Sequence, residues 1–466
     1  MRPVCESHKK NVTKGAPRTD VALYSRRSGV YTGWAERFVN APSPYSMGRL
    51  PNGSNGAARQ DHCTGLPNMP DSPQPISILT TTTLFPNSLQ PSHGIFVETR
   101  LRRLLEDARV QARVLAPVPW VPPGMPNPQQ RQLRHIPDSE RRGGLTVDHP
   151  RYLVIPKVGM NLAPHTLYRA MRRRLRRLLA AGLKIDLIDA HYFYPDGVAA
   201  AWLGQEFGLP VVITARGTDI NLIPAYPRPR RLILEAAQSA GAMITVCQAL
   251  KDELVELGAA ADKITVLRNG VDLQIFQPKD RAALRAKLGV SGFVLASVGL
   301  LIERKGHHLV IEAIARVPGA TLLIAGTGPD RPQLEALAAR LEVADRVRFL
   351  GGLDQNALCE VYNCADALVL ASSREGWANV LLEAMACGTP VLGSAVWGTP
   401  EVIARPEAGL LLESRDANGI AAAITQLRSA LPERAATRRY AEQFGWQPTT
   451  DGQVALFQSL LKRPSR

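Results

Sequence analysis

The sequence lacks the features that mark disulfide-rich, metal-finger and membrane-spanning proteins. Its six cysteines form no Cys-x-x-Cys pair and no spacing typical of a structural zinc site. They therefore predict free thiols in a reducing compartment. No apolar run approaches the roughly 20 residues of a spanning helix, and the N-terminus lacks the charged-then-apolar plan of a signal peptide. We expect the protein in the cytoplasm, either free or at the inner face of the cell membrane.

Aromatic and acidic residues are also in short supply. Aromatic residues make up only 6% of the chain although 45% of it is hydrophobic, a balance typical of packed α/β layers rather than of a fibrous or disordered chain. The excess of Lys and Arg gives a net charge of +15, which predicts an anionic partner. Charge alone leaves open a membrane surface, a phosphorylated substrate or nucleic acid.

Part of the positive charge lies in one segment, residues 167–179, with the sequence LYRAMRRRLRRLL. Leucines and a methionine recur there at helical spacing among six arginines, so the segment predicts a basic amphipathic helix. Two interpretations stay open: an apolar stripe on the core with a solvated basic face, and contact with anionic lipid headgroups. A nucleic-acid-binding protein is disfavoured, because only Tyr168 stands near the arginines to stack on a base.

The first 74 residues differ in composition from the rest of the chain. They are rich in Ser, Pro, Gly, Asn and basic residues and show no sustained periodicity, so we expect an N-terminal extension that is disordered. A strand pattern begins at Ile76, shortly after Met69. One hypothesis is therefore that translation starts at Met69 and that the preceding stretch does not belong to the native protein.

From residue 75 onward, short apolar runs alternate with helical patterns, which indicates βαβ units and largely parallel sheets. The pattern stops at LQIFQPKD and restarts with FVLASVG, so the predicted class is α/β, with two Rossmann-like doubly wound domains at 75–275 and 276–445. A C-terminal helix and tail, 446–466, follows. Ligands of such sheets bind beyond the carboxyl ends of the strands, which predicts a site in the cleft between the domains. Residues 122–149 are predicted to form a long irregular loop, an insertion or a lid.

Two glutamates stand out in the segment SSREGWANVLLEAMACGTPVLGS. Glu383 lies among apolar helical residues, where an ionised carboxylate is costly unless hydrogen-bond donors satisfy it. Hydroxyl groups of a ligand are candidate donors, and an internal salt bridge is the alternative. Glu375, eight residues earlier, would contact another part of the same ligand, unless it forms a capping box with Ser372.

Glycine-containing loops follow two strands of the second domain. Gly299 ends one strand, and Lys305 follows in a glycine-flanked loop that suits a cation facing a diphosphate; an exposed loop lysine is the alternative. Gly326 and Gly328 would let the backbone approach a nucleotide, or simply form a turn, because G-x-G without a third glycine is a weak fingerprint. The first strand lacks the G-x-G-x-x-G turn altogether, which disfavours an NAD oxidoreductase.

These motifs resemble those of glycosyltransferase family 4 over roughly residues 76–445; the segments that carry the resemblance are EGWANVLLEAMACGTPVLGS, VGLLIERKGHHLVIEAI, AGTGP and VLRNGVD. The resemblance implies the GT-B fold, with an N-terminal acceptor-side domain and a C-terminal nucleotide-sugar domain. It also implies transfer of a hexose-type sugar from a UDP or GDP sugar with retention of configuration. LFPNSLQPSHGIFVETR, HYFYPDG and ARGTDIN further resemble bacterial members that act on exopolysaccharide, capsule or teichuronic acid.

We therefore predict a glycosyltransferase of cell-surface polysaccharide synthesis, whose partners are a nucleotide-diphosphate sugar and a glycan or lipid-linked acceptor. Peripheral membrane contact through 167–179 is the further expectation, and no nucleic acid is expected. Another GT-B enzyme is the alternative, either a nucleotide-sugar epimerase or a phosphorylase, which would need pyridoxal phosphate.

The resemblance implies a role for each matching residue. Glu383 would bind the ribose hydroxyls and Glu375 the hydroxyls of the donor sugar, while Lys305 neutralises the diphosphate. Gly94 would let the backbone of the first domain approach that diphosphate. The remaining donor-binding positions are the loop glycines and the residues around the helix start: Gly299, Gly326, Gly328, Trp377, Ala378, Asn379 and Val380. Fixed cations and amides would stabilise the charge that grows on the β-phosphate. No metal and no cofactor are expected, and the chain has no Asp-x-Asp motif.

The sequence departs from the family pattern at two positions. The family often has an arginine directly after the glycine that ends this strand, where Leu300 stands here, so neutralisation of the diphosphate would depend on Lys305. A histidine often found in the acceptor-side loop is replaced by Arg216. Arg216 and Asp219 either contact an anionic acceptor or diphosphate, or form a structural salt bridge. His191, at the carboxyl edge of a strand, either touches the sugar or is a satisfied capping residue.

Overall fold

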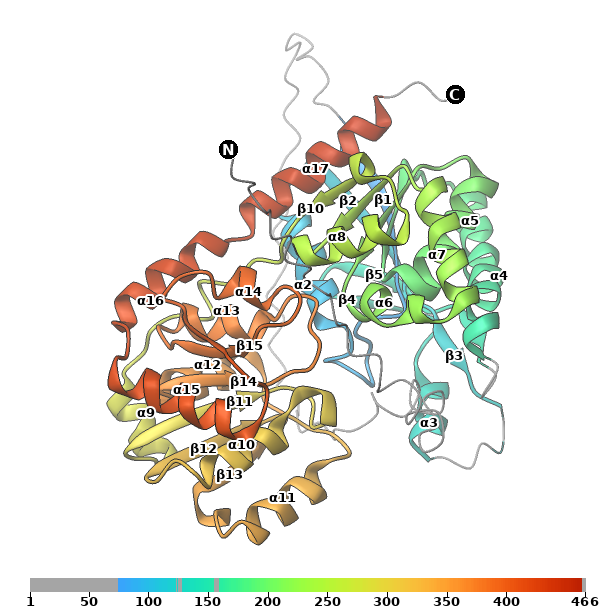
Figure 1. The fold of residues 1–466 in the computed structure, drawn as a ribbon. Helices are drawn as coiled ribbons and strands as arrows, with labels where there is room; N and C mark the ends of the chain where they lie inside the picture. Colours follow the sequence, from blue (N-terminus) through green and yellow to red (C-terminus); the bar gives the residue numbers. More distant parts are fainter. Residues whose placement is uncertain (1–73, 123, 125–127, 155–158, 463–466) are drawn as a thin grey trace, which may run out of the picture.

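The computed structural model describes residues 74–122, 124, 128–154 and 159–462. The predicted disordered extension, apart from residue 74, and the candidate start at Met69 lie outside the described residues. The chain forms two α/β domains, one drawn in blue to green and the other in yellow to orange in Figure 1. The predicted fold class, two Rossmann-like domains, is therefore confirmed. No helix of the described part has the length and apolar character needed to cross a membrane.

The first domain is built on an eight-stranded sheet of order β10-β9-β8-β7-β1-β2-β5-β4. All neighbouring pairs are parallel except β4 and β5. Figure 1 shows α4, α5 and α7 together on one side of this sheet. The strands are β1 (Ile76–Thr81), β2 (Val110–Leu115), β4 (Ser139–Arg142), β5 (Leu145–Asp148), β7 (Leu187–His191), β8 (Val211–Ala215), β9 (Ala242–Thr245) and β10 (Ile264–Val266). The helices are α2 (Ile95–Leu105), α4 (Gly159–Ala180), α5 (Val198–Phe207), α6 (Thr218–Asn221), α7 (Pro227–Ser239) and α8 (Gln248–Leu257).

The segment 122–149 is not the irregular loop that its composition predicted. It contains a short helix, α3 (Pro128–Gln132), and then the β4–β5 hairpin, in which β5 extends the main sheet beside β2. Leu145 and Val147 alternate inward and are buried, so the strand is held by its apolar face. A separate two-stranded ribbon pairs β3 (Val118–Trp120) with β6 (Arg151–Leu153).

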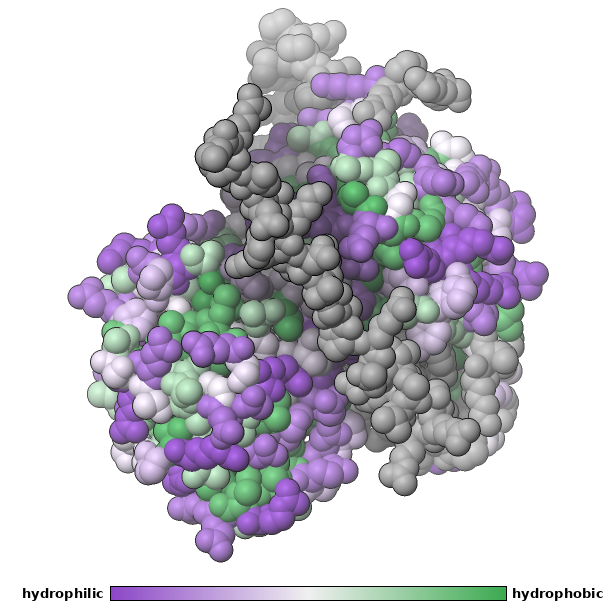
Figure 2. Space-filling view, in the orientation of Figure 1, coloured by the Kyte–Doolittle hydropathy of each residue, from purple (hydrophilic) through white to green (hydrophobic). Residues whose placement is uncertain are grey.

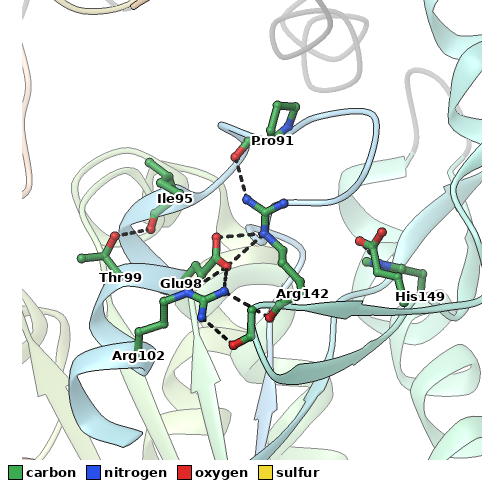
Figure 3. Close-up of polar contacts among 9 residues, drawn as sticks. Pro91, Ile95, Glu98, Thr99, Arg102, Arg142 and His149 are labelled. Atoms are coloured by element: carbon green, nitrogen blue, oxygen red, sulfur yellow. Dashed lines mark hydrogen bonds and ion pairs between the residues drawn. The ribbon is translucent and has the colours of Figure 1, made fainter. Parts of the chain in front are cut away.

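Glu98 of α2 holds the hairpin against the domain (Figure 3). Its carboxylate is only 4% exposed and pairs with two arginines. Arg142 Nε lies 3.0 Å from both carboxylate oxygens, and Arg102 donates to Glu98 Oε1 and, from Nη1, to the Gly143 carbonyl at 2.8 Å. A buried carboxylate with two cationic partners fixes the hairpin in position, because losing it would leave both guanidinium groups without their counter-charge.

The second domain contains a six-stranded parallel sheet of order β13-β12-β11-β14-β15-β16. The alternation of strands and helices predicted for this half is present. The strands are β11 (Phe293–Val298), β12 (Ala320–Ala325), β13 (Val347–Gly351), β14 (Ala367–Leu370), β15 (Val391–Ser394) and β16 (Gly409–Leu412). The helices are α9 (Arg281–Leu288), α10 (His307–Ile314), α11 (Arg331–Arg340), α12 (Gln355–Cys364), α13 (Asn379–Ala386), α14 (Thr399–Val402) and α15 (Ala417–Ser429).

The chain passes between the domains twice. The first passage lies between β10 and α9, and the second follows α16 (Arg434–Ala441). The C-terminal helix α17 (Gln447–Leu461) then runs back over the first domain (Figure 1). Val454 and Phe457 of α17 are fully buried in one cluster with Ile78 and Leu101. The end of the chain is therefore part of the first domain's core.

The basic segment 167–179 lies within α4. Leu167, Met171 and Leu175 are buried. The apolar stripe therefore packs on the core, as the first of the two interpretations predicted. Several of the arginines form ion pairs; Arg172, for example, lies 2.7 Å from Glu206. In the orientation of Figure 2, hydrophilic side chains cover much of the visible surface over α4 and α7. Lipid contact through this surface stays a prediction.

We expect Glu98→Gln to lower the urea midpoint of unfolding, with a loss of about 1–3 kcal/mol, because two partly buried arginines lose their shared counter-charge. The matched control is Glu106→Gln at the C-cap of the same helix, since Glu106 is 62% exposed in its pair with Arg103 and such surface pairs contribute little. Equal midpoints for the two variants would show that the hairpin is held by other contacts.

Candidate active site

Lys305 and Glu375 form an ion pair beyond the carboxyl ends of β11 and β14. Lys305 lies on the short 3-10 helix Glu303–Lys305, and its Nζ is 2.6 Å from Glu375 Oε1. The two side chains are only 16% and 9% exposed. The pair is held in one geometry and is shielded from water. Its two charges would therefore interact more strongly with a ligand at this edge of the sheet than they would in water.

Glu375 is ionised in this environment. Burial by itself would raise the pKa of its carboxyl, but the charges of Lys305 and Arg304 hold that pKa below its usual value. The capping-box interpretation is wrong, because α13 begins only at Asn379, seven residues after Ser372. An ionised carboxylate can accept several hydrogen bonds, so it has capacity for ligand hydroxyls beyond the bond from Lys305.

The predicted glycine loops pack against each other. The amide of Gly299 donates to Ala325 O at 3.0 Å. A Cβ on Gly326 would lie 1.8 Å from Gly299 O, and one on Gly328 would lie 2.3 Å from Leu301 O. Both positions therefore require glycine for close backbone contact between neighbouring loops. Approach of these loops to a nucleotide stays a prediction.

Glu383 faces a pocket between the domains. The pocket is lined by Phe96 and Thr99 of α2, by Asn379 and Glu383 of α13, and by Trp446 of the second passage. Among the described residues no Lys, Arg or His forms an ion pair with Glu383, so the expected alternative of an internal salt bridge is not what the structure contains.

The carboxyl of Glu383 is poised to change its charge near neutral pH. Burial raises its pKa to about 7, and the hydrogen bond from Tyr362 Oη to Glu383 Oε2, at 2.8 Å, offsets only part of that rise. A carboxylate that is desolvated and has one neutral donor is under-compensated. Hydroxyl groups of a ligand would supply the missing donors.

Trp377 anchors the loop that leads into α13. Its indole is 7% exposed, and Nε1 donates to Asn269 O at 3.0 Å. Asn269 also contacts the first residue of the helix, with its Nδ2 3.4 Å from Asn379 Oδ1. Ala378 and Val380 flank Asn379, and phosphate binding by the amides of this helix start stays a prediction.

On the acceptor side, the structure brings His191, Arg216 and Asp219 together. His191 is 1% exposed and lies between Asp189 Oδ2, at 3.2 Å, and Arg216 Nη2, at 2.7 Å. Burial lowers the pKa of His191, and the charge of Arg216 acts in the same direction against that of Asp189. Of the two interpretations of His191, the geometry favours a satisfied, structural residue.

Asp219 does not pair with the Arg216 guanidinium. Its carboxylate accepts hydrogen bonds from the amides of Phe193, Arg216 and Gly217, at 2.7, 3.0 and 2.7 Å. It therefore caps the turn after β8, and the expected salt bridge with Arg216 is wrong. Arg216, the partly exposed member of the three, is the one that can reach a ligand.

The two domains touch at the loop that carries Glu375. A Cβ on Gly376 would lie 2.0 Å from Arg216 O, and Asn221 Nδ2 is 3.4 Å from Glu375 O. Gly94 is also confined, because it has φ 66° and a Cβ there would lie 2.3 Å from Leu84 O. Local packing accounts for Gly94, and its approach to a diphosphate stays a prediction.

The sequence matches two family descriptions that lie side by side along the chain. Glycosyltransferase Family 4 matches residues 99–275, and Glycosyl transferases group 1 matches residues 280–444. A D-inositol 3-phosphate glycosyltransferase of Saccharomonospora viridis is 32% identical over 305 residues, which cover 59% of this chain and 70% of that protein. The chain belongs to glycosyltransferase family 4.

Further relatives carry the same name or a different one. A D-inositol 3-phosphate glycosyltransferase of Geodermatophilus obscurus is 34% identical over 304 residues, covering 58% of this chain and 66% of that protein. An N-acetyl-alpha-D-glucosaminyl L-malate synthase of Bacillus anthracis is 31% identical over 250 residues, covering 52% of this chain and 65% of that protein. The match thus spans about two thirds of the length of these relatives.

Solved structures share the fold. Sucrose-phosphate synthase of Thermosynechococcus elongatus superposes with a TM-score of 0.69 at 22% identity, over 83% of this chain and 99% of that one. The Anabaena protein Alr3699/HepE, solved with UDP and glucose, superposes with a TM-score of 0.64 at 22% identity, over 82% and 100%. These likenesses establish the GT-B architecture for this family 4 member.

Three residues that contact the site or its supports, Tyr362, Asn269 and Arg100, were not predicted from the sequence. Tyr362 is the hydrogen-bond partner of Glu383, and Asn269 links the first passage to α13 and to Arg216. Asn269 stands in the quoted segment VLRNGVD, so its place in the family pattern was a signal. The other two carried none, because their partners lie far away along the chain.

Replacing Glu383 by Gln should stabilise the family 4 fold at alkaline pH. Because the folded pKa of about 7 lies above the ordinary value of 4.5, the stabilising contribution of the protonated carboxyl is complete below about pH 4.5 and is lost as the pH rises through 7. Glu383→Gln should therefore gain roughly 2–3 kcal/mol over wild type at about pH 8, and much less at about pH 5. Urea unfolding at both pH values measures this. The control, Glu360→Gln on α12, should shift little, and a pH-independent gain in Glu383→Gln would contradict the assignment.

Gly376→Ala should weaken catalysis by keeping the domains apart, since the added methyl group meets Arg216 O. A misplacement of about 1 Å can cost about 100-fold in rate. Release of nucleoside diphosphate from a sugar donor would show the loss. Gly445→Ala is the control, because its Cβ would have no neighbour within 4 Å. If both variants kept the wild-type rate, the contact would have no role in closure.

Proposed function

We propose that the chain is a retaining, metal-independent glycosyltransferase that moves a hexose-type sugar from a nucleotide-diphosphate sugar to a glycan or lipid-linked acceptor in cell-surface polysaccharide synthesis. The observation that carries the proposal is the Lys305–Glu375 pair, which lies at the ligand edge of the second sheet and at the point where the first domain touches it. Glu383 supports it from the inter-domain pocket.

Lys305 would stabilise the departing diphosphate. As the bond between the sugar and the β-phosphate breaks, negative charge grows on the phosphate, and a cation already fixed by Glu375 needs little reorganisation to stabilise it. Glu375 would use its remaining acceptor capacity for hydroxyls of the sugar. Glu383 would accept hydrogen bonds from the two ribose hydroxyls, which gives a reason for a carboxylate on an otherwise apolar helix face.

The donor and the acceptor are inferred from different observations. A structural neighbour was solved with UDP-glucose, which favours a nucleotide sugar as the donor. The relatives are named for D-inositol 3-phosphate and for N-acetyl-alpha-D-glucosaminyl L-malate, so membership of family 4 does not by itself define the acceptor. The polysaccharide assignment follows from the resemblance of the front end of the chain. Arg173 and Arg177 are exposed on α4 and would contact anionic headgroups if the acceptor is lipid-linked.

A thermal-stability screen over UDP-, GDP- and ADP-hexoses tests the proposal. A ligand at about 100 times its dissociation constant should add roughly 2.7 kcal/mol to stability, so one nucleotide group should shift the melting temperature clearly. Glu383→Ala should abolish the shift, because the ribose loses its acceptor. Glu360→Ala on the adjacent helix should keep it. A normal response from Glu383→Ala, or no response of wild type to any nucleotide sugar, would refute the assignment.

A further inference from the structure

Six polar side chains form a closed hydrogen-bonded ring where the two domains are joined. They come from α2, β7, the turn after β8, the first passage and α17. Five of them are at most 4% exposed, and Arg216 is the partly exposed member. The ring consists of Arg100, Asp189, His191, Arg216, Asn269 and Gln453.

One half of the ring runs through α17 and β7. Arg100 Nε donates to Gln453 Oε1 at 3.0 Å, and Gln453 Nε2 donates to Asp189 Oδ2 at 3.3 Å. The same Asp189 oxygen is 3.2 Å from His191 Nε2. Because Arg216 can only donate, its contact with His191 Nδ1 assigns the proton of the neutral ring to Nε2, which donates to Asp189.

The other half of the ring fixes the Arg216 guanidinium. Arg216 Nη2 donates to His191 Nδ1 at 2.7 Å, and Nη1 donates to Asn269 Oδ1 at 3.2 Å. Arg100 Nη1 donates to the same oxygen, also at 3.2 Å. The guanidinium is thus held in one orientation from two sides, which a flexible surface arginine would not be.

One ring member lies on the first segment that joins the domains, and another lies on the helix that follows the second. Asn269 belongs to the first passage, and Gln453 lies on α17, just after the second. Asn269 also contacts Asn379, the first residue of α13. The position of Arg216 is therefore tied to the way the second domain is attached, and a change in the inter-domain geometry would move its supports.

Among the described residues, the hydrogen-bond partners of the Arg216 guanidinium are His191 and Asn269, and no carboxylate forms an ion pair with it. Burial lowers its pKa to about 9, and the neighbouring charge of Arg100 adds to this effect against Asp189 and Asp219. A guanidinium has five N–H donors, and the ring uses one from each terminal nitrogen. An anion bound to the remaining donors would restore the missing compensation.

The place of Arg216 points to the sugar donor as the source of that anion. Its guanidinium lies 5.6 Å from the centre of the Phe96 ring, which lines the same pocket as Glu383. Its carbonyl packs on Gly376, the residue after Glu375.

We propose that Arg216 is the first-domain half of a divided diphosphate site, facing Lys305 across the cleft, and that Asn269 and Gln453 position it. The inference rests on the proposed function and adds that the two cations of the site come from different domains. Arg216 would contact the phosphate oxygens, whereas Asn269 and Gln453 act through Arg216. The full positive charge on the diphosphate would then be present only when the domains are together.

Calorimetric titration with UDP or GDP, whichever gives the larger thermal shift, and with the matching nucleoside tests the proposal. Arg216→Met should weaken diphosphate binding about 10- to 100-fold, as expected for loss of a hydrogen bond to a charged group, and leave nucleoside binding unchanged. Arg216→Lys keeps the charge but loses the planar guanidinium that can donate two parallel hydrogen bonds. Its affinity for the diphosphate should lie between those of wild type and Arg216→Met. Unchanged nucleoside binding also shows that each variant is folded.

The matched control is Arg231→Met, which removes the same charge from an exposed position on α7 and should bind both ligands like wild type. If wild type binds the diphosphate and Arg216→Met binds it equally well, the divided site is wrong while the proposed function stands. If the affinity is unchanged and only the KM of the acceptor rises, the anion belongs to the acceptor and the assignment is overturned. If wild type binds neither diphosphate, the proposed function itself fails.

A double-mutant cycle tests the positioning role. Asn269→Ala should weaken diphosphate binding by less than Arg216→Met does and should leave nucleoside binding unchanged. The double variant should be no weaker than Arg216→Met alone, because in this proposal the effect of Asn269 on the diphosphate passes through Arg216 and not through its other contact, Asn379. Additive losses in the double variant would show that Asn269 contributes independently, and the positioning role would be rejected.

Discussion

The close backbone contact between the turn after β8 and the loop before α13 determines how the two domains face each other. Gly376 has no room for a side chain because Arg216 O occupies the position of its Cβ. The residue before it, Glu375, is paired with Lys305, and the residue after it, Trp377, bonds to the first passage. One loop of the second domain thus carries a candidate site residue, Glu375, and also contacts the first domain and the first passage.

The charged groups of the cleft share one physical condition, which is burial with partial compensation. Glu375 has a cation beside it and stays ionised, whereas Glu383 has only a tyrosine hydroxyl and its pKa rises. Arg216 has His191 and Asn269 as neutral partners, and its pKa falls. Groups that the protein leaves under-compensated are those that a charged or hydroxyl-rich ligand can complete.

Much of this arrangement was predictable from local patterns. Strands such as β11 and β12 end in glycine-containing loops, so the placement of Lys305 at a ligand edge followed from the order of the elements. The segment 122–149 shows the limit of that reasoning. Its Pro, Gly and Arg content predicted an irregular loop, but Leu145 and Val147 find a buried place beside β2 and make a strand. Composition could not show this, because the strand that pairs with β5 is β2, which lies some 30 residues earlier in the chain.

The sequence by itself determined the α/β class, the two-domain order and the identity of Lys305, Glu375 and Glu383 as candidate site residues, because these depend on periodicity and on residues close together in the chain. Only the tertiary structure decided that Asp219 caps a turn, that His191 is enclosed, and that His191 and Asn269 hold Arg216 within a ring that also includes Gln453. Those outcomes depend on hydrogen bonds and burial between residues as far apart as Asp189 and Gln453. Such contacts exist only once the chain has returned across both domains, so no local pattern could contain them.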